Sequence, residues 1–200
     1  MSDISEAVSE AVEQASESRL HSIIALLVAI IATFMALSSV KAGNLGQQMA
    51  EAQAQTVNAW SYFQSKSTKQ NLAEATVMQL QVQRAIAAPT LPPAALADLD
   101  QRIARYEANV KRYETEKNEI KAMAEGYQKE YASLNVHDDQ FDLSDAALSV
   151  SIALLGITAL TKKRWLLVFA IAGMIFGIFF GLAAFLRLDI HPEALTSLLG

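Results

Sequence analysis

The chain has 200 residues, no cysteine, 52% hydrophobic and 18% charged residues, and a formal net charge of -5 at pH 7. The excess of acids argues against a nucleic-acid-binding protein, which would meet phosphates with Lys and Arg. Without cysteine, disulfides, thiol catalysis and zinc-thiolate sites are excluded. This composition predicts membrane spans joined to one polar domain.

Residues 1–21 predict a short, acidic amphipathic helix. Apolar residues recur at helical intervals from Ile4 to Ala15, and glutamates gather on the other face. The acidic face should avoid anionic lipid, which leaves a solvated lead-in or a helix that docks a partner.

Residues 22–40 are the first predicted transmembrane helix, an uncleaved signal anchor because mostly polar, acidic residues precede it. Small residues recur along it at steps of four and three, on one seam where another helix could approach closely. This seam contains Ala25, Ala29, Ala32, Ala36 and Ser39.

Residues 41–141 predict a long antiparallel helical hairpin with its tip at 89–93, where three prolines break the helix. Apolar residues follow a coiled-coil pattern on both arms, most clearly from Leu96 to Leu134. The pattern leaves open whether the arms pair within one chain or between chains.

The second and third predicted spans are residues 142–161 and 165–186. We expect a solvated return loop at His137-Asp138-Asp139, and a new helix capped by Asp142 or Ser144. The 187–200 segment is a predicted C-terminal tail.

The turn between these spans holds three cations, Lys162, Lys163 and Arg164, and no acid. Under the positive-inside rule this turn is cytoplasmic, so the hairpin domain and the tail are predicted to be periplasmic.

The third span contains Gly173, Gly177 and Gly181, which form a groove of the small-xxx-small type. Two occupants fit this pattern. The groove could hold the second span through its own small face, or it could hold another subunit of a homo-oligomer, which is the use we expect. The small face of the second span contains Ala146, Ser149, Ala153 and Gly156.

An aromatic cluster on the first arm, with Trp60, Tyr62, Phe63 and nearby Lys66, is a candidate partner-binding surface; the alternative is packing on the second arm. The stretch 58–67, with its Trp-x-Tyr-aromatic-Gln-x-Lys-Ser pattern, resembles the bacterial domain-of-unknown-function 4337 (DUF4337) family of membrane proteins. The resemblance implies an N-terminal span, a long helical region and a terminal pair of spans, and it implies no activity.

No catalytic constellation, cofactor motif or metal-ligand spacing can be recognised, so we expect no enzyme, no cofactor and no metal. The sequence therefore predicts an all-α, three-span protein of the bacterial inner membrane. Its expected role is a scaffold or accessory subunit, working in the lipid bilayer as a homo-oligomer or within a larger membrane complex. The alternative function is an oligomeric channel lined by the small residues of the first span, with Thr33 and Ser38 nearby.

Overall fold

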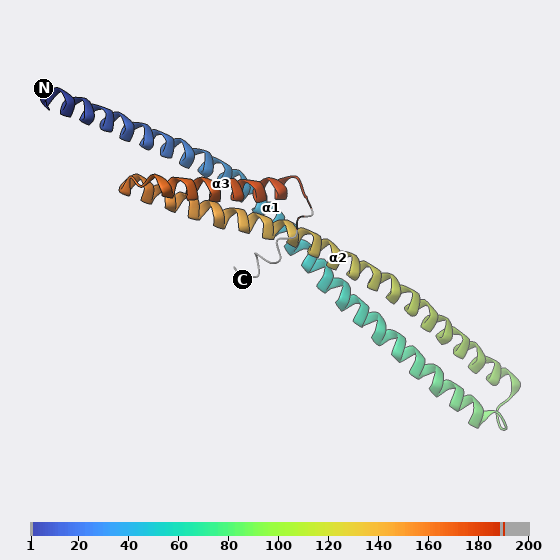
Figure 1. Cartoon of the computed structure of the whole chain (residues 1–200). Coiled ribbons are helices and arrows are strands. Elements are labelled where there is room, and N and C mark those ends of the chain that lie inside the picture. Colours follow the sequence, from blue (N-terminus) through green and yellow to red (C-terminus); the bar gives the residue numbers. More distant parts are fainter. Residues whose placement is uncertain (1, 189, 191–200) are drawn as a thin grey trace. The chain divides into compact units, whose positions relative to one another are not determined.

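The computed structural model is all helical over the residues that it describes, which are 2–188 and 190, with side chains from residue 19 onward. Helix α1 runs Ser2–Ala87, α2 runs Pro93–Thr161 and α3 runs Arg164–Phe185 (Figure 1). Each contains a stretch that is long and apolar enough, by length and composition, to cross a membrane. The all-α class is confirmed, and the two very long helices fit the predicted hairpin.

Helix α1 continues past Lys41, Gly43 and Gly46, as the absence of proline predicted. It includes the predicted N-terminal segment, whose expected acidic face lies outside the described side chains. Most of the predicted C-terminal tail lies outside the described residues as well.

The turn between α1 and α2 falls at the proline cluster. The amides of Thr90 and Leu91 both bond to the carbonyl of Ala87, at 3.0 Å. Pro93 then begins α2, where its missing N–H costs no helical hydrogen bond and its fixed φ favours helix.

The predicted return loop and new helix start near residue 140 are wrong, because α2 is one continuous helix. His137 is buried within it, and neither Asp142 nor Ser144 caps a helix. The heptad pattern of the hairpin continues along α2 after two successive steps of three residues, from Tyr131 to Leu134 to His137. Such a three-residue insertion in the heptad repeat overwinds a coiled coil locally without breaking the helix. The continued positions are all buried: Leu134, His137, Phe141, Ser144, Leu148, Ser151, Leu155 and Thr158.

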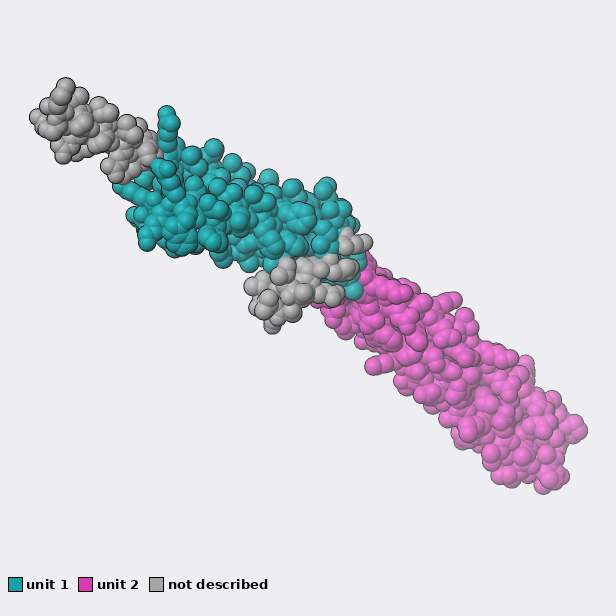
Figure 2. Space-filling view, viewed as in Figure 1, with its two compact units in different colours: residues 1–48, 132–200 teal, residues 49–131 magenta. Residues whose placement is uncertain are grey.

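The chain forms two compact units (Figure 2). Unit 1 comprises residues 1–48 and 132–200, and unit 2 comprises residues 49–131. The core of unit 1 draws on all three helices, with Ile24, Ile31, Leu148, Leu155 and Ala170 at its centre. The buried apolar residues of unit 2 come from both arms: Met49, Ala52, Ala73, Val77, Ile103, Ile120 and Ala124.

Candidate functional site

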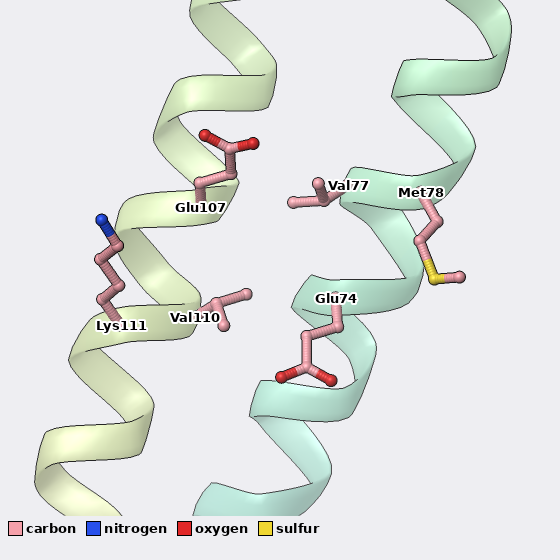
Figure 3. A pocket seen from close by; sticks show the side chains of 6 residues that line it. All are labelled: Glu74, Val77, Met78, Glu107, Val110 and Lys111. Carbon is pink, nitrogen blue, oxygen red and sulfur yellow. The ribbon is translucent and has the colours of Figure 1, made fainter.

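A groove in unit 2 lies between the two arms of the hairpin, with a volume of about 570 Å³. Val77 of α1 and Val110 of α2 point toward one another across it (Figure 3). The charged side chains of Glu74, Glu107 and Lys111 also line it. An apolar floor with a charged border suits the binding of an apolar side chain of a partner better than it suits catalysis.

Two of the three aromatic side chains of the predicted cluster, Trp60 and Phe63, contact other side chains of the hairpin. Trp60 and Phe63 pack edge to face, with ring centroids 5.4 Å apart. The ammonium of Lys117 lies 5.9 Å from the Phe63 ring centroid. Tyr62 is 54% exposed, so it is the one aromatic of the three with much surface left for a partner.

Lys66 reaches across the hairpin to α2. Its Nζ donates to Glu116 Oε2 at 2.5 Å, and lies 5.2 Å from the Tyr62 ring centroid and 5.7 Å from that of Tyr113. Next to it, Lys117 Nζ donates to Gln70 Oε1 at 2.8 Å. These polar positions of the coiled-coil seam therefore pair the two arms within one chain and fix their register.

A second cross-arm ion pair lies near the tip of the hairpin. The guanidinium of Arg84 holds both carboxylate oxygens of Asp100, with Nη2 donating to Oδ2 at 2.9 Å. The hydrogen bond and the charge of Arg84 lower the pKa of Asp100.

The hydrogen bond from Lys66, and then its charge, likewise lower the pKa of Glu116, while the hydrogen bond to Glu116 raises the pKa of Lys66. A lowered carboxyl pKa stabilises the fold above the unfolded-state value, about 4.3 for Glu. That contribution is lost as the pH falls through the folded-state pKa. The stability that comes from the raised pKa of Lys66 is fully present below about pH 10.4, the unfolded-state pKa of lysine. It is lost as the pH rises through the folded-state pKa.

We expect acid to weaken the hairpin less in Glu116→Gln than in the wild type, because the variant has no carboxylate to neutralise at this position. Hydrogen exchange of residues 60–70 and 110–120 measures this, after correction for the intrinsic pH dependence of exchange. Glu114→Gln removes an exposed acid of the same helix and serves as the control. Equal acid-induced loss of protection in the wild type and Glu116→Gln would contradict a stabilising ion pair.

The glycine groove of α3 is filled by the chain itself. A Cβ placed on Gly173 would lie 2.5 Å from Ser151 Oγ, and one on Gly177 would lie 2.7 Å from Leu148 Cγ. One on Gly181 would lie 2.6 Å from the ring of Phe34. Of the two alternatives, intrachain packing is therefore the one that the described residues show, and it leaves no open groove at these three glycines for another subunit.

The face of α2 that fills the groove is not the small face expected from the sequence. Ser149, Ala153 and Gly156 are exposed, and a methyl group added to Gly156 would meet nothing within 4 Å. The small seam of α1 is also unused within the chain. All five of its members are exposed: Ala25, Ala29, Ala32, Ala36 and Ser39.

Sequence reasoning missed a row of buried hydroxyls on α2. Ser144 Oγ donates to the carbonyl of Gly177 at 2.7 Å and so links α2 to α3. Ser151 and Thr158 donate to carbonyls four residues earlier in their own helix. Such internal bonding satisfies polar groups that water does not reach. The continued heptad spacing was the signal that could have found them.

The predicted cytoplasmic turn is tighter than expected. α2 ends at Thr161 and α3 begins at Arg164, so only Lys162 and Lys163 lie between the helices. Lys162 adopts a left-handed conformation with φ 56°. Its amide bonds to the carbonyl of Thr158 at 2.9 Å, which closes the last turn of α2.

Among the described residues, no group of three or more metal-ligating side chains gathers. The family model described as "Domain of unknown function (DUF4337)" matches residues 20–187 of the chain. No curated protein and no solved structure matches the chain. The match takes in most of α1, the hairpin tip, α2 and α3, and the chain therefore belongs to the DUF4337 family.

Proposed function

We propose that this protein is a non-enzymatic scaffold or accessory subunit of the bacterial inner membrane, and that it self-associates through its hairpin. The outward side chains of unit 1 support membrane insertion. Large apolar residues such as Leu26, Leu37, Val168 and Phe169 are more than half exposed there, which suits contact with lipid.

The observation that carries the self-association is an uncovered apolar face on the distal part of α1 in unit 2. Leu72 is 68% exposed, Met78 63%, Val82 58% and Ile86 75%. We call these four residues the distal face. A hairpin of two helices has no further layer with which to cover it, and such a face in water favours association.

A second copy of the chain is the occupant that the charge pattern favours. From residue 71 to 87 only Glu74 and Arg84 are charged, and Arg84 is paired with Asp100. In a two-fold contact the same surface meets itself, so a nearly uncharged face carries little repulsion. Two hairpins joined in this way would form a four-helix arrangement with a shared apolar core.

Single cysteines test this contact directly, because the natural chain has none. We expect Val82→Cys or Ile86→Cys to form disulfide-linked dimers in membranes under mild oxidation. A disulfide requires two Cα atoms within about 7 Å, which is met only near the two-fold axis. Glu119→Cys, on an exposed position of α2, should remain monomeric on denaturing gels.

Native mass spectrometry provides the second measurement. Val82→Glu should shift the wild-type oligomer toward monomer while leaving helicity unchanged. A wild-type protein that is monomeric in mild detergent, or cysteines that link only to other proteins, would overturn self-association through the distal face.

Topology is tested separately. The basic turn supports a periplasmic hairpin. We expect Gln101→Cys, exposed on α2, to react with a membrane-impermeant maleimide in intact spheroplasts. Thr161→Cys, exposed at the end of α2, should react only after the membrane is opened. The opposite pattern would invert the orientation.

A second candidate function is an oligomeric channel, favoured by the exposed small seam of α1. Thr33 is exposed near this seam, but Ser38 is buried and could not line such a pore without rearrangement. Copies meeting along Ala25 to Ser39 would place weakly polar surface around a central path. Reconstituted protein without conductance under voltage or tension would remove this candidate.

A further inference from the structure

A small hollow in unit 1 lies where the three helices meet, at the end of the apolar stretches of α1 and α3. Its enclosed part is about 10 Å³, which is room for a single water. A larger group would therefore sit at its mouth. The polar and aromatic lining includes Lys41, Asn44, Gln48, His137, Phe141 and Arg187.

The lining brings two cations together. Lys41 comes from α1, and Arg187 follows α3, more than 140 positions later in the chain. None of the described residues that line the hollow is a carboxylate, and neither cation forms an ion pair with a described residue. Asn44 and Gln48 add neutral amide donors one turn apart on α1.

The floor of the hollow is formed by buried, hydrogen-bonded side chains. His137 is 95% buried, since only 5% of it is exposed, and its Nδ1 lies 3.4 Å from Gln140 Oε1. The side-chain amide of Gln140 donates to the carbonyls of Leu188 and Ile190, at 2.8 and 2.7 Å. Gln140 thus holds the histidine on one side and the chain that follows Arg187 on the other.

The backbone of Arg187 has a left-handed conformation, with φ 52°. The amide of Leu188 bonds to the carbonyl of Ala183 at 2.9 Å, and that of Arg187 bonds to Ala184 at 3.2 Å. This is the Schellman pattern at a helix end, in which glycine is the usual residue at the left-handed position. An arginine there places a guanidinium at the hollow despite backbone strain, and strained residues often mark binding sites.

We propose that this hollow binds an anionic phosphate group, with Lys41 and Arg187 as the charged ligands and the two amides as neutral donors. Arginine pairs with phosphate oxygens through two parallel hydrogen bonds, and lysine adds a point charge. The phosphate can belong to a lipid headgroup, because the hollow lies at the end of two apolar stretches, or it can be free in solution. The site rests on unit 1 alone and does not depend on self-association through the distal face.

The experiment uses delipidated full-length protein in a neutral detergent, with thermal unfolding and native mass spectrometry as measurements. Three probes are added separately: inorganic phosphate, phosphatidylglycerol and diacylglycerol, a lipid without phosphate. A rise in Tm with inorganic phosphate supports a soluble anion as the ligand, and a rise with phosphatidylglycerol alone supports the lipid headgroup. No rise with inorganic phosphate or phosphatidylglycerol, or an equal rise with diacylglycerol, would overturn the proposal.

Variants separate binding from folding. Arg187→Gly should relieve the backbone strain, so the Tm without ligand is kept or raised, while affinity for the stabilising probe falls about tenfold or more. Lys41→Gln should also lower the affinity for the stabilising probe, because it removes the second cation of the hollow, which lies on α1.

Lys162→Gly is the matched control, because Lys162 has the same left-handed conformation after α2 but does not line the hollow. It should keep the full response to the probe. Unchanged affinity in both Arg187→Gly and Lys41→Gln would show that the anion binds elsewhere.

Discussion

Replacing Gly177 with alanine is expected to destabilise the packing of α3 on α2 by about 1–3 kcal/mol. The added methyl would lie 2.7 and 2.9 Å from two carbons of Leu148, and 3.0 Å from the carbonyl oxygen of Ser144. Leu148 is fully buried, and the backbone oxygen cannot move without the helix. The helices must therefore separate, which also stretches the 2.7 Å bond from Ser144 to the Gly177 carbonyl.

Thermal unfolding of the full-length protein in detergent measures the effect, with circular dichroism to verify that helicity is retained. Gly156→Ala is the matched control, since a methyl group there meets nothing within 4 Å. It should leave the Tm unchanged or raise it, because alanine favours helix over glycine. A Tm for Gly177→Ala equal to that of Gly156→Ala would contradict the close approach of α2 and α3.

Combining Gly177→Ala with Leu148→Ala makes the test sharper. Leu148→Ala alone should destabilise unit 1, because it removes a core side chain. In the double variant the new methyl occupies part of the space that Leu148 vacates, so the combined loss should be smaller than the sum of the two single losses. Strict additivity would mean that these two residues do not compete for the same space.

Replacing Ile120 with alanine is expected to destabilise the hairpin by about 2–5 kcal/mol. Ile120 is 7% exposed and lies one turn before Ala124, which is fully buried between the arms. A two-helix unit has no third layer that could move in to fill the cavity. Since neighbouring seam positions are polar, among them Lys66 and Lys117, few other apolar contacts can compensate.

Hydrogen exchange of the full-length protein shows where the loss occurs. Protection should fall across residues 49–131 in Ile120→Ala and remain in the helices of unit 1. Met123→Ala is the control three residues away, because Met123 is 55% exposed and its loss should change stability by no more than about 0.5 kcal/mol. Equal effects of the two substitutions would contradict the burial of Ile120 between the arms.

The sequence by itself determined the all-helical class and most of the hairpin, but not that α2 continues unbroken past residue 140. Prolines near residue 90 placed the turn, and α1 ends at Ala87 and α2 begins at Pro93 accordingly. The heptad pattern predicted the seam of unit 2, because in water an apolar side chain is stabilised on only one face of a helix. Ile103, Ile120 and Ala124 of that pattern are buried.

Only the tertiary structure decided which faces meet in unit 1. All sides of an apolar span tolerate lipid, so hydrophobicity does not distinguish an inward face from an outward one. The small seam beginning at Ala25 thus remains outside, while Ile24 and Ile31 are buried. Likewise, the meeting of Lys41 and Arg187 at one hollow depends on how three helix ends come together, a long-range arrangement that local spacing does not encode.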